Sequence, residues 1–359
     1  MFSNTMNRFS CITVLIFGVF LLAQTGCHTK NAGETVSEAL VLNEASVSEF
    51  AANIANNLLY DNASALNDAI DKEHIKMLLS ENSIVYSGFD VKGGQAYFEH
   101  SLQLGDQVEQ ALNNGGEFNF IHYYLDGSTH HAVFRVYNNY IVDFYDCEVD
   151  TVNGKMMIED CYVYSLGTKL SENVKYNMLY NLLLQTNPDS DARWLKEAEE
   201  QTVAGKHQEA LKTLEAHREA LADYPLFYQL YIVNLYQHNP KTFIAKMETL
   251  SDQIDPRYKL FHELHYYYAQ GDPEGAEKTV NSLIPYTGDD PIYLFLLGQA
   301  FENGKQYDKA VECYQILGQS MPLFWDLWQS EMHCYKMLGD TAALRKCMMR
   351  GDEEFGPAE

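Results

Sequence analysis

Apolar and polar residues alternate with helical spacing through the second half of the chain. From residue 191 onward, apolar side chains recur three or four positions apart, as on one face of an amphipathic helix. Turn residues interrupt this spacing at Gly205, Gly271, Gly304 and Gly339. The pattern predicts five helix pairs, over residues 191–224, 225–256, 257–290, 291–324 and 325–356, of which the second is short and lacks the glycine. Because one pair cannot bury its apolar face alone, we expect all five to stack as one solenoid over residues 191–359.

The pattern over residues 46–172 is different. Helical spacing in three segments, 48–59, 65–79 and 97–112, gives way to the strict alternation of strands. The alternating segments are residues 117–125, 131–137, 140–147 and 156–164, joined by turn sequences such as Asn153-Gly154. We expect an α+β domain in which helices precede a four-stranded antiparallel meander. A helix within residues 173–190 should connect this domain to the first helix pair.

A period of 34 residues runs through the last helix pairs. Its residues in the fourth pair are Leu294, Leu297, Gly298, Phe301, Ala310, Tyr314 and Pro322. The set resembles the signature of tetratricopeptide (TPR) repeats, W-x₂-L-G-x₂-Y, then A-x₃-F, then P, with Leu294 in the place of the Trp. The resemblance implies an all-α superhelical solenoid that binds other proteins.

The order of helices followed by a meander resembles the NTF2-like (cystatin-like cone) fold. The resemblance implies a sheet wrapped around a conical pocket, which is catalytic in some members and only binds a ligand or a protein in many. Strand residues that could line such a pocket are His122, Arg135, Tyr137, Asp143 and Tyr145. Asp143 and Tyr145 lie two apart and share a face, where a carboxylate base and an acid could stabilise an enolate. The alternatives are a ligand pocket without chemistry, or a solvated face that serves for docking or as the interface of a homodimer.

The start of the chain has the pattern of an export signal. An apolar run over residues 11–23 is shorter than the roughly 20 residues that span a bilayer, and the sequence Gln24-Thr25-Gly26-Cys27 follows it. This resembles a bacterial lipoprotein signal over residues 1–26, which implies a lipid on Cys27; Gln24 departs from the usual Leu, and an ordinary cleaved signal is the alternative. His28, where Asp would favour the inner membrane, favours the periplasmic side of the outer membrane. Residues 27–45 are polar and predict a flexible tether.

Charge narrows the range of partners. The chain has 25 Lys and Arg against 50 Asp and Glu, a net charge of −25. So acidic a protein repels phosphate backbones, and we expect no nucleic-acid partner.

The cysteines and histidines leave two chemical hypotheses. Cys147 and Cys161 flank the predicted Asn153-Gly154 turn and could form a cross-strand disulfide, with buried free thiols as the alternative. Cys334 and Cys347 lie on the two helices of the last pair. His262 and His265 in the sequence His-Glu-Leu-His are one residue closer than in the H-E-x-x-H zinc motif, and no third ligand is in view. We therefore expect no metal and no cofactor.

The first helix of each pair should line the inner face of the solenoid. Stepping by the period predicts a row of residues on this face that is polar along its midline and flanked by aromatic rings. The members of this inner row are Asn234, Phe261, His265, Tyr268, Phe295, Gln299, Glu302, His333 and Lys336. Such a groove could hold an extended peptide through amide hydrogen bonds and ring packing. The sequence thus favours a lipid-anchored periplasmic adaptor that is not an enzyme; the alternative is small-molecule binding or isomerisation in the NTF2-like pocket, with the repeats serving assembly.

Overall fold

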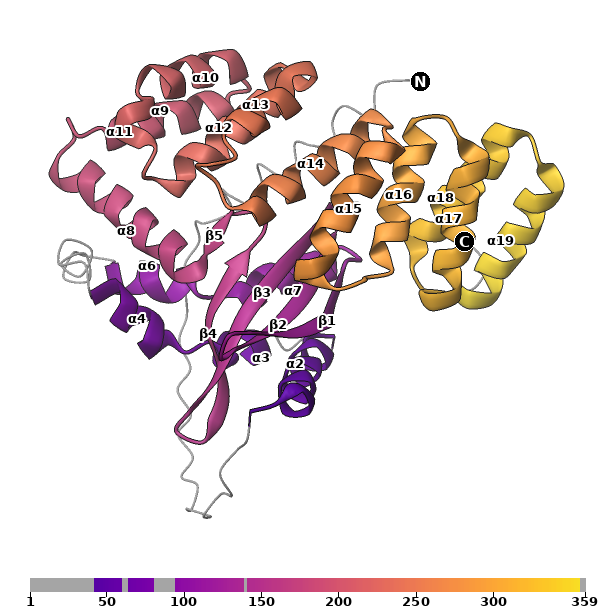
Figure 1. The fold of residues 1–359 in the computed structure, drawn as a ribbon, viewed down its shortest axis with the longest axis horizontal. Helices are drawn as coiled ribbons and strands as arrows, with labels where there is room; N and C mark the ends of the chain where they lie inside the picture. The colour runs from indigo at the N-terminus through magenta and orange to yellow at the C-terminus, as the bar shows by residue number, and fades with distance from the viewer. Residues whose placement is uncertain (1–41, 60–63, 81–93, 139–140, 356–359) are drawn as a thin grey trace. The chain divides into compact units, whose positions relative to one another are not determined.

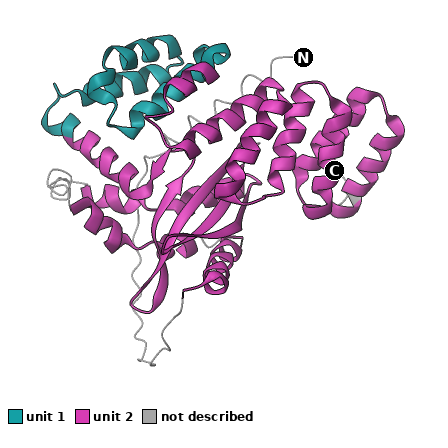
Figure 2. Cartoon of the chain, in the orientation of Figure 1, with its two compact units in different colours: residues 1–40, 183–243 teal, residues 41–182, 244–359 magenta. Residues whose placement is uncertain are grey.

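A computed structural model describes residues 42–59, 64–80, 94–138 and 141–355. The expected signal, Cys27 and residues 27–41 of the expected tether lie outside the described residues. The predicted α+β character is confirmed: the described chain has a five-stranded antiparallel sheet and 17 helices (Figure 1). It divides into two compact units (Figure 2). Unit 1 contains residues 183–243, and unit 2 contains residues 41–182 and 244–359. This division cuts across the boundary at residues 190–191 expected from the sequence.

Five helices precede the sheet in unit 2: α2 Glu44–Leu58, α3 Ser64–Ala69, α4 Lys72–Ser80, α6 Gly94–Ser101 and α7 Leu104–Asn113. α2 begins at Asn43, whose side chain accepts a hydrogen bond from Ser46 N while Ser46 Oγ accepts one from Asn43 N. The single helix predicted over residues 65–79 is two helices. Ile70, between α3 and α4, forms a β-bridge with Ile158, so the backbone leaves the helix there.

The sheet is a meander in the order β1-β2-β3-β4-β5. The strands are β1 Glu117–Asp126, β2 Thr129–Asn138, β3 Ile141–Val152, β4 Lys155–Val163 and the short β5 Thr168–Lys169, which the sequence pattern did not predict. The turn between β3 and β4 is Asn153-Gly154, both at positive φ, as a two-residue hairpin turn requires. A bulge in β1 near Phe120 moves the side chains after it by one position, so that Tyr123 and Phe120 lie on the same side of the sheet.

Both faces of this sheet are covered. One face, which carries Phe118, Phe134 and Tyr145, packs against α2, α3, α4 and α7 in a first hydrophobic core. The opposite face packs against helices of the second half of the chain in a second core. The sheet residues of this second core are Val133, Tyr137, Val142, Phe144, Tyr162 and Tyr164. The sheet is therefore the middle layer of unit 2.

The rest of unit 2 is three antiparallel helix pairs: α14 Pro256–Gln270 with α15 Pro273–Thr287, α16 Ile292–Asn303 with α17 Tyr307–Ser320, and α18 Trp325–Leu338 with α19 Thr341–Phe355. Local signals set their ends. The Asp255 side chain caps α14 by accepting from Arg257 N, and Gly271 at φ 70° ends it. Small residues allow the helices to approach. Ala276 and Ala310 are fully buried, and Gly298 faces the ring of Tyr314.

Unit 1 is helical. It begins within α8 (Leu170–Thr186), ends at the first residue of α13 (Phe243–Thr249), and contains α9 Ala192–Val203, α10 His207–Ala216, α11 Arg218–Leu221, α12 Pro225–His238 and the 3-10 turn η2 Pro240–Thr242. The ring of Trp194 stacks on His217 at 3.9 Å. Asn234, from the inner row, is fully buried and donates to Thr202 Oγ1 at 2.7 Å. It therefore joins α12 to α9 within this unit.

Candidate functional site

The contacts that join the sheet to the helix pairs of unit 2 involve two of the expected pocket residues, Arg135 and Tyr137, together with residues that the sequence did not single out. We call them the sheet–helix interface. Its polar members from the sheet are Tyr124, His131, Arg135, Tyr137 and Asp146, and those from the helix pairs are Asp255, Arg257, Asp290 and Asp326. These side chains cross between segments more than 100 residues apart in sequence, so they fix how the helix pairs lie on the sheet.

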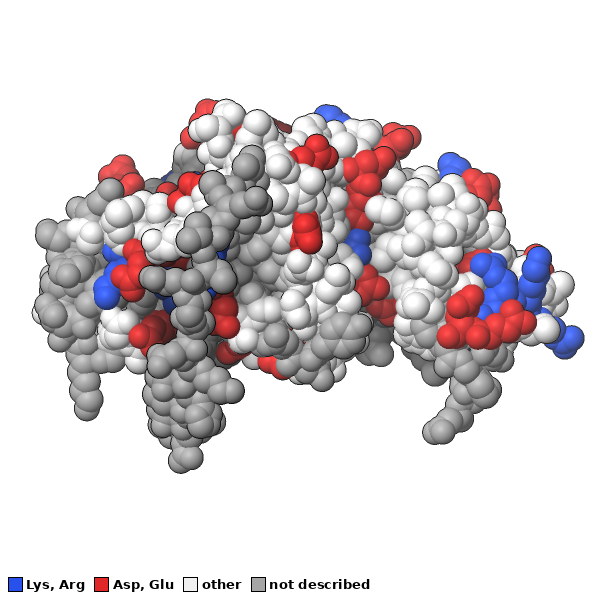
Figure 3. Space-filling view, turned by 90° about the horizontal axis from the view of Figure 1, so that it is seen from below, with Lys and Arg blue, Asp and Glu red and all other residues white. Residues whose placement is uncertain are grey.

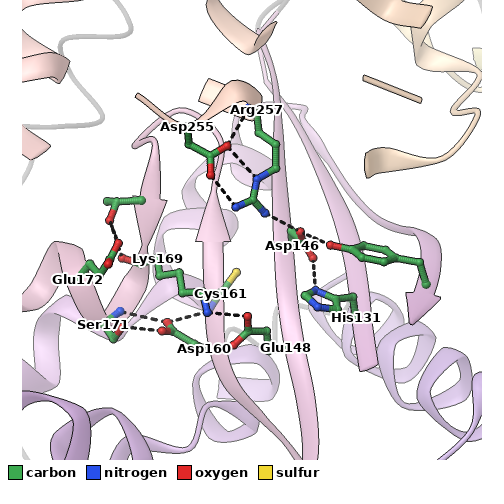
Figure 4. Close-up of polar contacts among 12 residues, drawn as sticks. His131, Asp146, Glu148, Asp160, Cys161, Lys169, Ser171, Glu172, Asp255 and Arg257 are labelled. Atoms are coloured by element: carbon green, nitrogen blue, oxygen red, sulfur yellow. Dashed lines mark hydrogen bonds and ion pairs between the residues drawn. The ribbon is translucent and has the colours of Figure 1, made fainter. Parts of the chain in front are cut away.

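Asp146 on β3 is the centre of one part of this interface. Its carboxylate, on a residue only 1% exposed, accepts hydrogen bonds from Tyr124 OH at 2.6 Å, His131 Nδ1 at 2.8 Å and Arg257 Nη1 at 3.0 Å (Figure 4). The Arg257 guanidinium also lies 3.6 Å above the ring of Tyr162. Three donors satisfy a carboxylate that burial alone would make costly, and the cation–π contact stabilises the guanidinium that supplies one of them.

Arg135 on β2 makes the reverse connection. Its guanidinium donates from Nη1 to Asp290, in the loop between α15 and α16, and from Nη2 to Glu117 at 3.0 Å. Nearby, Tyr137 OH donates to Asp326 at the start of α18. A sheet arginine thus contacts a helix-side carboxylate, and a helix-side arginine contacts a sheet carboxylate. Removing one partner of a buried pair can cost about 3–5 kcal/mol, because the other charge then stays buried without compensation.

The inner row does not form an open groove in unit 2. Phe261, His265, Tyr268, Phe295 and Gln299 are all buried, Glu302 is half-buried, and His333 and Lys336 are exposed. The physical reason is that the sheet covers the row. The ring of Phe295 meets the ring of Tyr137 edge-on, at 6.0 Å between centroids. Tyr137 of the expected pocket and the aromatic rings of the row therefore pack against each other, which leaves no open groove at this point.

The polar midline of the row serves the helix stack. Gln299 Nε2 donates to Tyr314 OH at 2.8 Å and to Ser330 Oγ at 2.9 Å, which joins α16 to α17 and α18. Tyr314 OH donates in turn to Glu302 Oε2 at 2.8 Å. His265 Nδ1 lies 2.8 Å from the Phe261 carbonyl, and burial lowers the pKa of His265 to about 4. These hydrogen bonds are therefore made between residues of the helix stack.

The five expected pocket residues are divided between the two faces of the sheet. His122, Arg135 and Tyr137 lie toward the helix pairs, where the His122 ring packs beside Gly288. Asp143 and Tyr145 share the opposite side of β3, as their spacing predicts. Burial raises the pKa of Asp143 to about 6, but its oxygens are occupied by the backbone N–H and hydroxyl of Ser165. The five residues therefore do not form one site.

A cleft of about 240 Å³ lies elsewhere, between α4 and the segment that contains α6. Its lining residues are Lys72, Glu73, Lys76, Gln95, Phe98, Glu99 and Gln103. Charges of both signs line it, and none of the expected pocket residues takes part. This cleft is not an apolar pocket around Asp143, so it does not support the hypothesis of a small-molecule site there.

Sequence reasoning missed Asp146, Arg257 and Asp290, although one signal was available. The segment from His131 to Tyr137 has large or apolar residues at successive positions, which is typical of a strand buried on both faces. β2 is indeed buried along nearly its whole length. A charged residue at Arg135 in such a strand requires a partner from another element.

The last helix pair presents a different kind of surface. Met337 and Leu338 on α18 are 51% and 48% exposed, and Met348 and Met349 on α19 are 50% and 63% exposed. Lys336 on α18 is also exposed, as are Arg345 and Lys346 on α19. We call these seven residues the methionine patch. Figure 3 shows Lys and Arg side chains gathered, next to Asp and Glu, at the end of the molecule where α19 lies in Figure 1.

On α19, the members of the patch are three or four residues apart and therefore share one side of the helix. Arg345 is three residues from Met348 and four from Met349, and Lys346 is three from Met349, so these side chains are neighbours on one helical face. Cys347, on the other side of α19, is buried. Met348 and Met349 thus share an exposed face of α19 with Arg345 and Lys346, on a chain whose net charge is −25.

Comparisons with known proteins add no assignment. No protein-family model, no curated protein and no solved structure matches the chain. Among the described residues, no helix has the length and apolar character needed to cross a bilayer. The same residues include no cluster of three or more His, Cys, Asp or Glu side chains placed to hold a metal ion.

Proposed function

We propose that this protein is a lipid-anchored periplasmic adaptor that binds another protein through the methionine patch. The observation that carries the proposal is the exposure of four large apolar side chains on α18 and α19, while the part of the inner row on α14, and Phe295 and Gln299 on α16, are buried. Methionine side chains are flexible and polarisable, and they are over-represented on surfaces that bind helices of other proteins. The lipid on Cys27 would hold the adaptor at the outer membrane, where confinement raises its effective concentration toward membrane-bound partners.

The charges around the patch define the partner. Lys336, Arg345 and Lys346 would attract an acidic segment, and the methionines would pack against its apolar face. We therefore propose an acidic amphipathic helix of a partner protein as the occupant. A second copy of this chain fits less well, because two basic patches brought together by symmetry would repel each other.

We also propose the family of each half. The 34-residue period and the close packing of Gly298 on Tyr314 support a tetratricopeptide assignment for the helix pairs. The order of helices followed by a meander supports an NTF2-like assignment for residues 46–172. In this proposal the sheet covers the inner face of the repeats, and partners bind on the outside.

The test compares affinities for a partner identified by crosslinking in cell envelopes and then purified. The patch variant is Met348→Ser/Met349→Ser, and the matched control is Met77→Ser on α4, since Met77 is 55% exposed. Loss of two central apolar contacts should weaken binding by about tenfold or more, and the control should bind like the wild type. Arg345→Glu/Lys346→Glu should also weaken binding and reduce its salt dependence.

Two results would refute the proposal that the methionine patch binds the partner. One is equal affinity of the wild type and the patch variant for every purified partner. The other is a binding segment on the partner that is basic or lacks an apolar face. Binding lost in a Phe295→Ala variant that remains folded, and kept in the patch variant, would return the function to the inner row.

A further inference from the structure

Two thiols face each other in the middle of the sheet. Cys147 on β3 and Cys161 on β4 are register partners, and their Sγ atoms lie 2.9 Å apart. Each residue is 1% exposed and lies in the first core, beneath the helices that precede the sheet. Both are free thiols in this structure.

The geometry is close to that of a disulfide. Residues directly opposite in antiparallel strands have Cβ atoms about 4.5–5.5 Å apart, and a disulfide needs about 3.5–4.5 Å together with an S–S bond of about 2.05 Å. The sulfurs therefore need to approach by less than about 1 Å, which side-chain rotation and a small strand adjustment can supply. Cys313, Cys334 and Cys347 lie on the helix pairs, and Cys347 Sγ is directed to Glu331 at 3.5 Å.

We propose that Cys147 and Cys161 form an intramolecular disulfide that crosslinks β3 to β4 when the protein folds in an oxidising compartment. The oxidant is a disulfide, either of a thiol–disulfide oxidoreductase or of a small thiol. The thiolate of one cysteine attacks it and releases the first thiolate, leaving a mixed disulfide. The second cysteine, as its thiolate, attacks the cysteine sulfur of the mixed disulfide and releases the second. The two cysteines lose two protons and two electrons, and the oxidant becomes two thiols.

Burial determines when this reaction can occur. In the folded protein an oxidant cannot reach either sulfur, and burial raises the pKa of both thiols, which removes the reactive thiolate. The β3–β4 hairpin is local, whereas the helices that cover it must dock from a distant part of the chain. The bond should therefore form while the hairpin is exposed, and the folded reduced protein should resist oxidation.

The experiment uses the full chain, reduced and unfolded, then refolded with either oxidised and reduced glutathione or a reductant. After refolding, the free thiols are alkylated in denaturant and the chain is digested without reduction. We expect the oxidised sample to give one crosslinked pair of peptides, containing Cys147 and Cys161, with a mass about 2 Da below their sum. Cys313 should be alkylated in both samples. Glutathione added to protein already folded in reductant should not produce the crosslink.

Variants separate the crosslink from incidental oxidation. Cys147→Ala leaves Cys161 without a partner, so oxidative refolding should give a glutathione adduct or a free thiol there, while Cys313→Ala should leave the crosslink intact. Complete alkylation of Cys147 and Cys161 in the oxidised wild type would overturn the proposal. Glutathione on both residues would overturn it equally. The wild-type peptide map decides between these outcomes even if a variant does not fold.

Discussion

Replacing Gly298 with Ala should destabilise the helix stack, although Ala is the better helix former. A Cβ at this position of α16 would lie 2.8 Å from Cδ1 and 2.9 Å from Cζ of Tyr314, and closer still to Cε1. Carbon atoms in contact prefer about 3.5–4.0 Å, so the ring or the helix must move. The ring is fully buried, and its hydroxyl is held by Gln299 and Glu302.

The magnitude follows from two opposing terms. Overpacking of a well-packed core costs about 1–3 kcal/mol, and displacing the Tyr314 hydroxyl loses hydrogen bonds of about 1 kcal/mol each. Replacing Gly by Ala in a helix contributes about 1 kcal/mol in the stabilising direction. The net expectation for Gly298→Ala is a loss of about 2 kcal/mol in the free energy of unfolding.

Gly318 in α17 supplies the matched control. There an added Cβ meets only Leu327 Cδ2, at 3.4 Å, which is an ordinary contact. Gly318→Ala should therefore stabilise the protein by about 0.5 kcal/mol or leave it unchanged. Urea unfolding followed by far-ultraviolet circular dichroism measures both variants against the wild type. Equal effects of the two substitutions, or stabilisation by Gly298→Ala, would refute the packing argument.

Two further predictions concern the sheet–helix interface and the buried histidines. Asp146→Asn should lower the free energy of unfolding by about 1.5–3 kcal/mol, because Arg257 loses its charged acceptor across the interface and keeps only Asp255, and thermal denaturation checks this. Burial lowers the pKa of His262 to about 3 and that of His265 to about 4, so below pH 6.5 the unfolded chain binds protons that the folded chain does not. Stability should therefore fall as the pH drops from about 6.5 toward 4, by up to about 1.4 kcal/mol per pH unit for each histidine, and His262→Phe should show a shallower slope between pH 7 and 4.5. An unchanged slope in this variant would contradict the pKa assignment.

The helix pairs could be predicted closely because their signals are local. Asp255 and Gly271 cap α14 through atoms within a few residues, and the 34-residue period repeats such signals along the chain. Helix α13 has only seven residues, in the pair that the sequence already marks as irregular, and the division between the compact units falls there. The weakest helix signals therefore lie where the chain passes from one compact unit to the other.

In the sheet, features that depend on distant segments could not be predicted from the sequence. Turn residues such as Asn153-Gly154 set the pairing beside each turn, and a register shift between Glu148 and Val149, which the sequence did not indicate, then brings Cys147 opposite Cys161. What covers the second face of the sheet depends on contacts between segments more than 100 residues apart, and no spacing rule reports those. The split of the helix predicted over residues 65–79 has the same origin, because Ile70 pairs with β4.

The covered face determines where a partner can bind. A peptide entering the inner row of unit 2 would have to displace the sheet from Phe295 and separate Asp146 from Arg257 and Arg135 from Asp290. Displacing the sheet would also expose buried apolar side chains such as Phe295 and Tyr137 to water, at about 1.5–3 kcal/mol for each large side chain. A few such side chains are comparable to the whole binding free energy of a micromolar complex, about 8 kcal/mol. The methionine patch requires no such separation, since its apolar side chains already face solvent. For this reason the methionine patch on the last helix pair is a better site for a partner than the buried part of the row that the repeat pattern alone indicates.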